Sequence, residues 1–74
     1  MLVSKTTLIH QKIAEKIREI RKERGVTQES LAHQASLNRA YIGYIERGER
    51  KPSVDTLHKI SKVLKVDLYE LFKF

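Results

Sequence analysis

Side chains suited to catalytic or metal chemistry are sparse in this sequence. It has no cysteine, so it offers neither a disulfide nor a thiolate metal ligand. The three histidines, His10, His33 and His58, lie far apart and lack the spacing of a metal-binding motif. No nucleophile stands beside a base in a local catalytic signature, and no glycine-rich loop is suited to hold a phosphate. The sequence therefore gives little support to an enzyme, and we expect no metal or cofactor.

Positive charge is the chemistry that the sequence does supply. Lysine and arginine number 15 against 9 acidic residues, which leaves a formal net charge of +6. A small basic domain attracts polyanions, either nucleic acid or an anionic membrane surface. Charge that serves only solubility is the alternative. No apolar run approaches the roughly 20 residues that span a bilayer, and the N-terminus lacks the features of a signal peptide, so we expect a cytoplasmic protein.

The length of 74 residues is enough for one domain with a small core, and we expect a single domain over residues 1–74. The hydrophobic periodicity predicts an all-α chain of five helices without a convincing strand. The first helix is expected over about residues 6–24, ending at Gly25, with a buried stripe of Ile9, Ile13, Ile17 and Ile20. Its other side is expected to be a solvated face of mixed charge, formed by Lys12, Glu15, Lys16, Arg18, Glu19, Lys22 and Glu23.

Four shorter helices follow, each after a residue whose side chain is suited to cap it. Thr27 precedes a helix over about residues 28–35, and Asn38 precedes one that ends near residue 48. Ser53 precedes a fourth helix, with an apolar side of Leu57, Ile60 and Leu64. Asp67 opens a brief fifth helix, in which Glu70 is expected to complete a capping box.

The segment over residues 27–48, TQESLAHQASLNRAYIGYIERG, leaves only about three residues between the second and third helices. So short a connection makes the two helices cross steeply. The apolar residues suit such a crossing, because Leu31 and Ala35 face inward from the first of the pair and Ile42 and Ile45 from the second, while Leu37 fills the turn.

This segment resembles the helix-turn-helix of the phage repressor and Cro family, also called the XRE family. The order of the five helices is similar to that family from about residue 8 to 72, and the string YIGYIERGERKPS is especially close to its common pattern. Within the family, the chain looks most like the controller proteins of restriction-modification systems. Ser36 is a departure, since the turn often has glycine there. The resemblance implies a compact, five-helix, lambda-repressor-like DNA-binding domain.

The resemblance also implies DNA contacts at individual positions. Gln28, first in the second helix, is expected to bind a backbone phosphate together with the amide groups of that helix start. Arg39 is the main candidate for base reading, because its planar fork matches O6 and N7 of guanine. The expected base-contacting residues are Arg39, Ala40, Gly43 and Tyr44. The expected phosphate-contacting residues are Gln28, Asn38, Tyr41, Arg47, Arg50, Lys51 and Ser53.

Several of these assignments have structural alternatives. Arg39 could be an ordinary exposed arginine, although its charge opposes the dipole at a helix start, which favours a functional reason. Tyr44 could pack at the edge of the core. Gly43 costs about 1 kcal/mol relative to alanine in mid-helix, and either close approach to DNA or neutral drift would explain it. The basic cluster after the third helix contains Glu49, so part of it could be a solvated loop.

Two further expectations concern the surroundings of this site. In the family, the positions that match Arg21 and Glu46 form an ion pair between the first helix and the recognition helix, and we predict the same pair here. A twofold dimer is expected, since it would read two half-sites about one helical turn apart. The C-terminal segment, about residues 66–74, is the expected dimer interface, although some of its apolar residues must close the monomer core: Val66, Leu68, Leu71, Phe72 and Phe74.

Together these features predict a regulator that binds a near-palindromic, double-stranded DNA operator as a homodimer. Controllers of this type regulate their own promoters, with RNA polymerase and a second dimer as further partners. One alternative is the antitoxin of a toxin-antitoxin pair, which a toxin-like neighbouring gene or a co-purifying partner would identify. Another is a protein-interaction module on the same fold, which would lack salt-dependent affinity for DNA.

Overall fold

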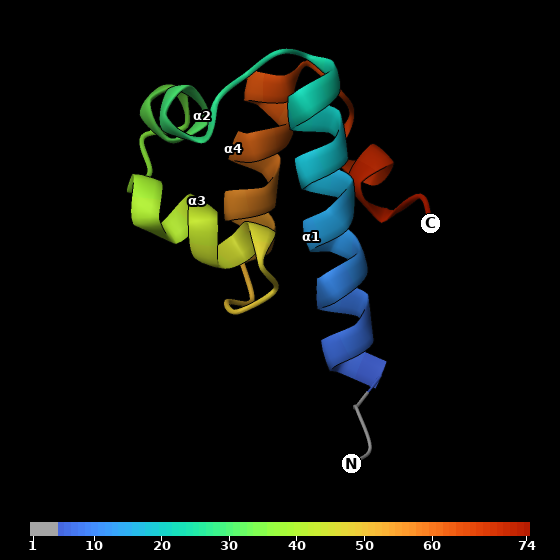
Figure 1. Cartoon of the computed structure of the whole chain (residues 1–74). Coiled ribbons are helices and arrows are strands. Elements are labelled where there is room, and N and C mark those ends of the chain that lie inside the picture. The colour runs from blue at the N-terminus through green and yellow to red at the C-terminus, as the bar shows by residue number, and fades with distance from the viewer. Residues whose placement is uncertain (1–4) are drawn as a thin grey trace.

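The computed structural model describes the backbone of residues 5–74 and the side chains of residues 8–74. The chain forms four α-helices and a final 3₁₀ helix (Figure 1): α1 (Lys5–Glu23), α2 (Gln28–Gln34), α3 (Arg39–Glu46), α4 (Val54–Leu64) and η1 (Leu68–Phe72). No β-strand occurs over residues 5–74. The all-helical prediction is confirmed, but the prediction of a fifth α-helix is wrong. None of the helices in this range is long and apolar enough to cross a membrane.

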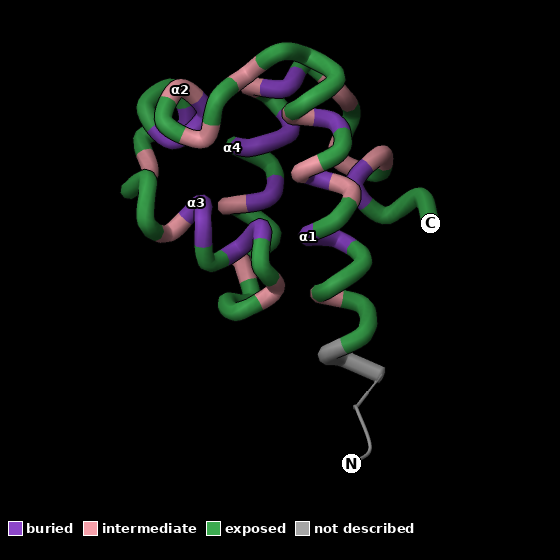
Figure 2. Tube along the Cα trace, viewed as in Figure 1, coloured by how far each residue is buried: buried purple, intermediate pink, exposed green. Residues whose placement is uncertain are grey.

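The helices surround a small apolar core. α3 packs against both α2 and α1, α2 also contacts α4, and η1 packs against α1 and α4. Figure 1 shows α2 and α3 on one side of the molecule and η1 with the C-terminus on the other. Each helix turns its buried positions inward (Figure 2). The fully buried apolar side chains are Ile17, Leu31, Ile42, Ile60 and Leu71, with Ile45 and Leu64 almost as enclosed.

The buried stripe of α1 is shorter than the sequence predicts. Ile13, Ile17 and Ile20 are buried, but the side chain of Ile9 is 47% exposed. Figure 1 shows that the first turns of α1 extend beyond the other helices, away from the packed part of the molecule. The expected contribution of Ile9 to the core is therefore wrong.

The three expected caps on α2, α3 and α4 are formed. Thr27, Asn38 and Ser53 each accept a hydrogen bond through the side-chain oxygen from a backbone N–H two or three residues later, at 2.7–3.1 Å. The expected capping box of Asp67 and Glu70 is wrong, because Asp67 makes no side-chain cap hydrogen bond. Only the backbone closes this turn, with the N–H of Glu70 donating to the Asp67 carbonyl at 2.9 Å. So short a segment favours the tighter 3₁₀ geometry over an α-helix.

Two residues other than glycine adopt the left-handed conformation that closes these connections. Ser36, in the turn between α2 and α3, has φ of 56°, and Lys65, which ends α4, has φ of 59°. Gly25 ends α1 at φ of 67°, as expected for a glycine stop. The left-handed conformation costs a residue with a Cβ about 1–2 kcal/mol. Ser36 and Lys65 are therefore sites of local strain.

Candidate nucleic-acid interface

α3 divides into a buried and an exposed side. Ile42 and Ile45 are buried in the core, whereas Arg39 and Ala40 are exposed and Tyr44 is 39% exposed. The Arg39 guanidinium makes no hydrogen bond or ion pair within the described chain. Three of the four residues that the family resemblance assigns to base contacts are thus exposed, whereas the fourth, Gly43, is buried. Arg39, the main candidate for base reading, is among the exposed residues.

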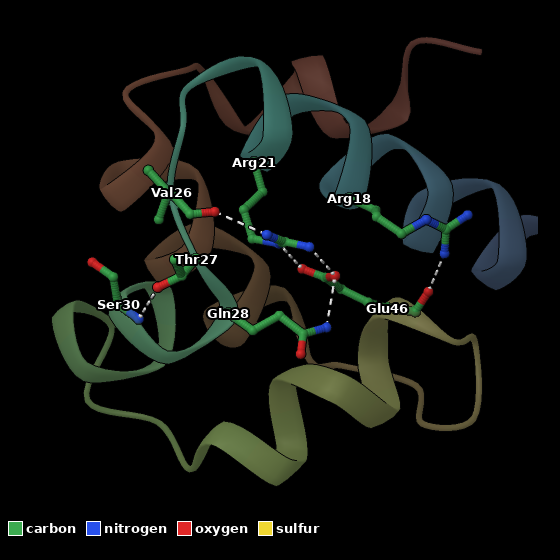
Figure 3. Close-up of polar contacts among 7 residues, drawn as sticks. All are labelled: Arg18, Arg21, Val26, Thr27, Gln28, Ser30 and Glu46. Atoms are coloured by element: carbon green, nitrogen blue, oxygen red, sulfur yellow. Dashed lines mark hydrogen bonds and ion pairs between the residues drawn. The ribbon is translucent and has the colours of Figure 1, made fainter.

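The orientation of α3 depends on a buried carboxylate at its last residue. Glu46 accepts from Arg21 at both oxygens, at 2.6 Å from Nε and 3.0 Å from Nη2 (Figure 3). The side chain of Arg21 is 11% exposed and that of Glu46 is 2% exposed. The structure thus joins the two residues that the resemblance pairs, one on α1 and one on α3. A buried pair of this kind is weak evidence for net stability, but its two-point geometry specifies one orientation.

Two more donors complete this arrangement, which we call the Glu46 network: Arg18, Arg21, Gln28 and Glu46. Gln28 Nε2, from the start of α2, donates to Glu46 Oε1 at 3.0 Å (Figure 3). Arg18 Nη1 donates to the backbone carbonyl of Glu46 at 2.6 Å. The network therefore joins the C-terminal half of α1, the start of α2 and the end of α3. One N–H of the Gln28 amide is used here, and its second N–H has no partner in the described chain.

The sequence placed Arg18 on a solvated face, whereas the structure shows it bound to the end of α3. Arg18 lies three residues before Arg21, so the two side chains are neighbours on the surface of α1. Nothing in the sequence identifies its acceptor, because that acceptor is a backbone carbonyl 28 residues away. Arg18 satisfies one of the carbonyls that a helix end leaves without an intrahelical partner.

A second polar arrangement lies at the end of α3, and we call it the Arg47 cluster: Gly43, Tyr44, Arg47, Glu49 and Arg50. The Arg47 guanidinium donates to Glu49 from Nε at 2.9 Å and from Nη2 at 3.4 Å. The ring of Tyr44 lies 5.1 Å from the Arg47 guanidinium carbon and 5.3 Å from that of Arg50. The Tyr44 ring therefore makes cation–π contacts with two guanidinium groups. The hydrogen bond to Glu49 raises the pKa of Arg47, which keeps its positive charge.

Gly43 provides room for this cluster. A Cβ atom at Gly43 would lie only 3.1 Å from Arg47 Nη1. The guanidinium of Arg47 thus lies against the backbone of α3, where a larger side chain would displace it. This is a structural role for Gly43 that the sequence did not suggest, beside close approach to DNA and neutral drift.

The other candidate phosphate contacts are dispersed around α3. Asn38 and Ser53 serve as the caps of α3 and α4, and Tyr41 is half-buried against the core. Lys51 is exposed. Of the seven phosphate candidates, the structure brings Arg47 and Arg50 together, on Tyr44. Over the described residues, no three acidic or histidine side chains are grouped as a metal site would require.

The C-terminal segment separates into a buried and an exposed part. Leu71 is fully buried in the core, so it has no surface to offer a second copy, and its assignment to the dimer interface is corrected. Val66 and Leu68 are half-buried and pack against the core. Phe72 is 40% exposed and Phe74 is 59% exposed. The surface that could contact another chain is therefore smaller than the sequence suggests, and it is aromatic.

Comparisons with known proteins agree with this arrangement of helices. Residues 17–71 match the helix-turn-helix family HTH_3. The chain is 41% identical to the control protein C.BamHI of Bacillus amyloliquefaciens over 70 residues, which are 93% of this chain and 86% of that protein. It is 45% identical to the control protein C.MunI of a Mycoplasma species over 58 residues, 77% of this chain and 78% of that one.

A solved structure extends the likeness to three dimensions. The restriction-modification controller protein C.AhdI from Aeromonas hydrophila is similar with a TM-score of 0.83 and 36% identity, over 85% of this chain and 96% of that one. The chain belongs to the helix-turn-helix family of XRE type, whose matched members are transcription regulators and controller proteins rather than enzymes.

Proposed function

We propose that this chain regulates transcription by binding a specific double-stranded DNA sequence through α3. The observation that carries the proposal is the exposed side of α3, where the Arg39 guanidinium makes no hydrogen bond or ion pair within the described chain and the Ala40 side chain is exposed. Arginine is suited to read guanine in the major groove, and a small apolar side chain is suited to contact a thymine methyl. The net charge of +6 adds attraction to the DNA backbone.

We assign the contacts as the family resemblance orders them. The base-contacting residues are Arg39, Ala40, Gly43 and Tyr44, and the phosphate-contacting residues are Gln28, Asn38, Tyr41, Arg47, Arg50, Lys51 and Ser53. The Glu46 network supports the assignment of Gln28, since it orients the Gln28 amide while leaving one N–H available. Fixed polar groups of this kind position a protein on the DNA backbone without reading its sequence.

The regulator acts as a homodimer of a single-domain chain, with the C-terminal segment at the interface. Phe72 and Phe74 are exposed aromatic residues of the kind enriched at protein interfaces. Figure 1 shows this segment on the side of the molecule opposite α3, so a dimer formed there would leave both copies of α3 uncovered. Val66 and Leu68 would border the contact, whereas Leu71 stays in the monomer core.

The biological role is that of a restriction-modification controller or a similar regulator of its own promoter in the cytoplasm. Two control proteins and one controller structure, each similar over most of its own length, support this role over other helix-turn-helix functions. The dimer binds a near-palindromic operator and blocks or recruits RNA polymerase according to the position of that operator. A second dimer on adjacent DNA would change the response as the protein accumulates.

Selection of bound duplexes from a random DNA pool, at near-physiological salt, tests the proposal. We expect enrichment of one twofold-symmetric site. Arg39→Ala, at an exposed position, should fold normally and lose preference for guanine at one position of each half-site. Retention of DNA without any preferred sequence would contradict base reading by α3. Absence of salt-dependent DNA affinity would instead favour a protein-interaction module on the same fold.

A further inference from the structure

Arg47 comes directly after α3, but its guanidinium does not lie beyond the end of the helix. Nη1 is 3.1 Å from the position of a Cβ on Gly43, so the side chain reaches back by one helical turn. Side chains of helical residues lean towards the N-terminus of their helix in this way. Arg39, Gly43 and Arg47 are spaced four residues apart and follow one side of α3. The Arg47 guanidinium therefore lies on the side that carries Arg39.

The hydrogen bonds to Glu49 occupy only one edge of this guanidinium. They come from Nε and Nη2, which together form its side edge. The other edge consists of Nη1 and the second N–H of Nη2, and no acceptor in the described chain binds it. That end edge is the planar fork that matches O6 and N7 of guanine. Glu49 thus orients Arg47 and leaves its recognition edge available.

The charge of Glu49 also distinguishes between two kinds of DNA contact. A phosphate bound to the Arg47 guanidinium would lie near a carboxylate and be repelled by it. A guanine edge accepts hydrogen bonds with only partial negative charge, so it meets much weaker repulsion. The pair is exposed, with 54% of the Arg47 side chain and 52% of the Glu49 side chain accessible. Such a pair adds little stability in water, so Glu49 and the Tyr44 ring, 5.1 Å from the guanidinium carbon, act together to orient Arg47.

We propose that Arg47 is a second base-reading residue, specific for guanine, and that Glu49 and Tyr44 are positioning residues for its guanidinium. The absence of a Cβ at Gly43 lets the Arg47 guanidinium lie close against the backbone of α3. This inference rests on the proposed DNA-binding function and changes two assignments within it: Arg47 moves from phosphate contact to base contact, and Tyr44 from base contact to positioning residue. It gives each half-site two arginine contacts along α3, from Arg39 near its start and from Arg47 near its end.

The test is to repeat the selection from random duplexes with Arg47→Lys, Arg47→Ala and Glu49→Gln. Lysine keeps the positive charge but lacks the planar fork. We expect Arg47→Lys to lose roughly 5- to 100-fold in discrimination for guanine at one position of each half-site, with the rest of the site and the salt dependence unchanged. Glu49→Gln should weaken the same preference. Glu19→Gln, which removes the same charge from the exposed side of α1, should leave every preference unchanged.

Three outcomes would overturn the inference. If Arg47→Ala weakens binding equally for all duplexes and Arg47→Lys restores it, Arg47 contacts a phosphate, and the regulator proposal survives. If Glu49→Gln strengthens binding to all duplexes with unchanged preferences, Glu49 acts only by repulsion and does not position Arg47. If the unaltered protein selects no sequence while remaining folded by circular dichroism, the proposed function and this inference fail together.

Discussion

α3 and the C-terminal segment both pack on α1 and bury apolar side chains, but α3 is also held there by buried, charged hydrogen bonds. α3 is joined to α1 by charged hydrogen bonds to Glu46, whose side chain is 2% exposed. The C-terminal segment is held by burial of Leu71, and its 3₁₀ helix has no side-chain cap. Hydrogen bonds are directional, whereas apolar burial is not. The chain therefore specifies the orientation of α3 more strictly than that of its C-terminal segment.

The largest effect on this comparison is expected from Glu46→Ala. Loss of the carboxylate leaves Arg21 buried without its counter-charge, which should lower the free energy of unfolding by about 3–5 kcal/mol. Urea denaturation would measure the change. Glu49→Ala is the matched control, because it removes an acidic residue whose pair with Arg47 is exposed, and it should cost less than about 1 kcal/mol. If both variants lost the same free energy of unfolding, burial of the Arg21–Glu46 pair would not be the reason for the effect of Glu46→Ala.

Leu71→Ala should have the next largest effect, at the other end of the molecule. Truncation of this fully buried side chain should cost about 2–5 kcal/mol, measured by the same denaturation. Leu71→Met should cost less than about 1.5 kcal/mol, since apolar contacts tolerate a change of shape at similar volume. If the methionine variant were as unstable as the alanine variant, packing at Leu71 would depend on side-chain shape as strictly as the Glu46 network depends on hydrogen-bond geometry.

Removal of both exposed aromatic side chains, in Phe72→Ala/Phe74→Ala, should affect association more than folding. Each aromatic group that a dimer buries contributes about 1.5–3 kcal/mol when burial is complete. Both are partly covered already, so we expect the dimer dissociation constant to rise by about 10-fold or more. Sedimentation equilibrium would measure it. Val54→Ala, at a 67% exposed apolar residue on α4, should leave association unchanged. An unchanged dimer in the double variant would place the interface elsewhere.

The smallest changes in stability are expected at two residues with positive φ, one just before α3 and one just before the C-terminal segment. Ser36→Gly and Lys65→Gly should each raise the free energy of unfolding by about 0.5–1 kcal/mol, because glycine relieves the strain of a positive φ at a cost in unfolded-state entropy. Ser36→Ala and Lys65→Ala keep a Cβ and serve as controls in the denaturation measurements. If glycine and alanine behaved alike at either site, backbone strain would not be the reason.

The features predicted successfully from sequence depend on residues close together in the chain. The caps Thr27, Asn38 and Ser53 were recognisable because each bonds a backbone group two or three residues away. The buried positions of α3 followed from helical periodicity. The same reasoning failed for Ile9, which has the right spacing but no neighbouring helix to cover it. It also failed for Asp67, where a suitable residue type forms no cap in a 3₁₀ helix.

The sequence by itself determined the helical class, the starts of α2, α3 and α4, and the buried apolar positions of α3, since local hydrogen bonding and periodicity control these. The pairing of Arg21 with Glu46 came from family resemblance, not from spacing. Only the tertiary structure decided that Arg18 and Gln28 join that pair, that Leu71 closes the core, and that Gly43 makes room for Arg47. These features depend on how helices distant in sequence meet and on the rotamers of long side chains, which local pattern does not specify.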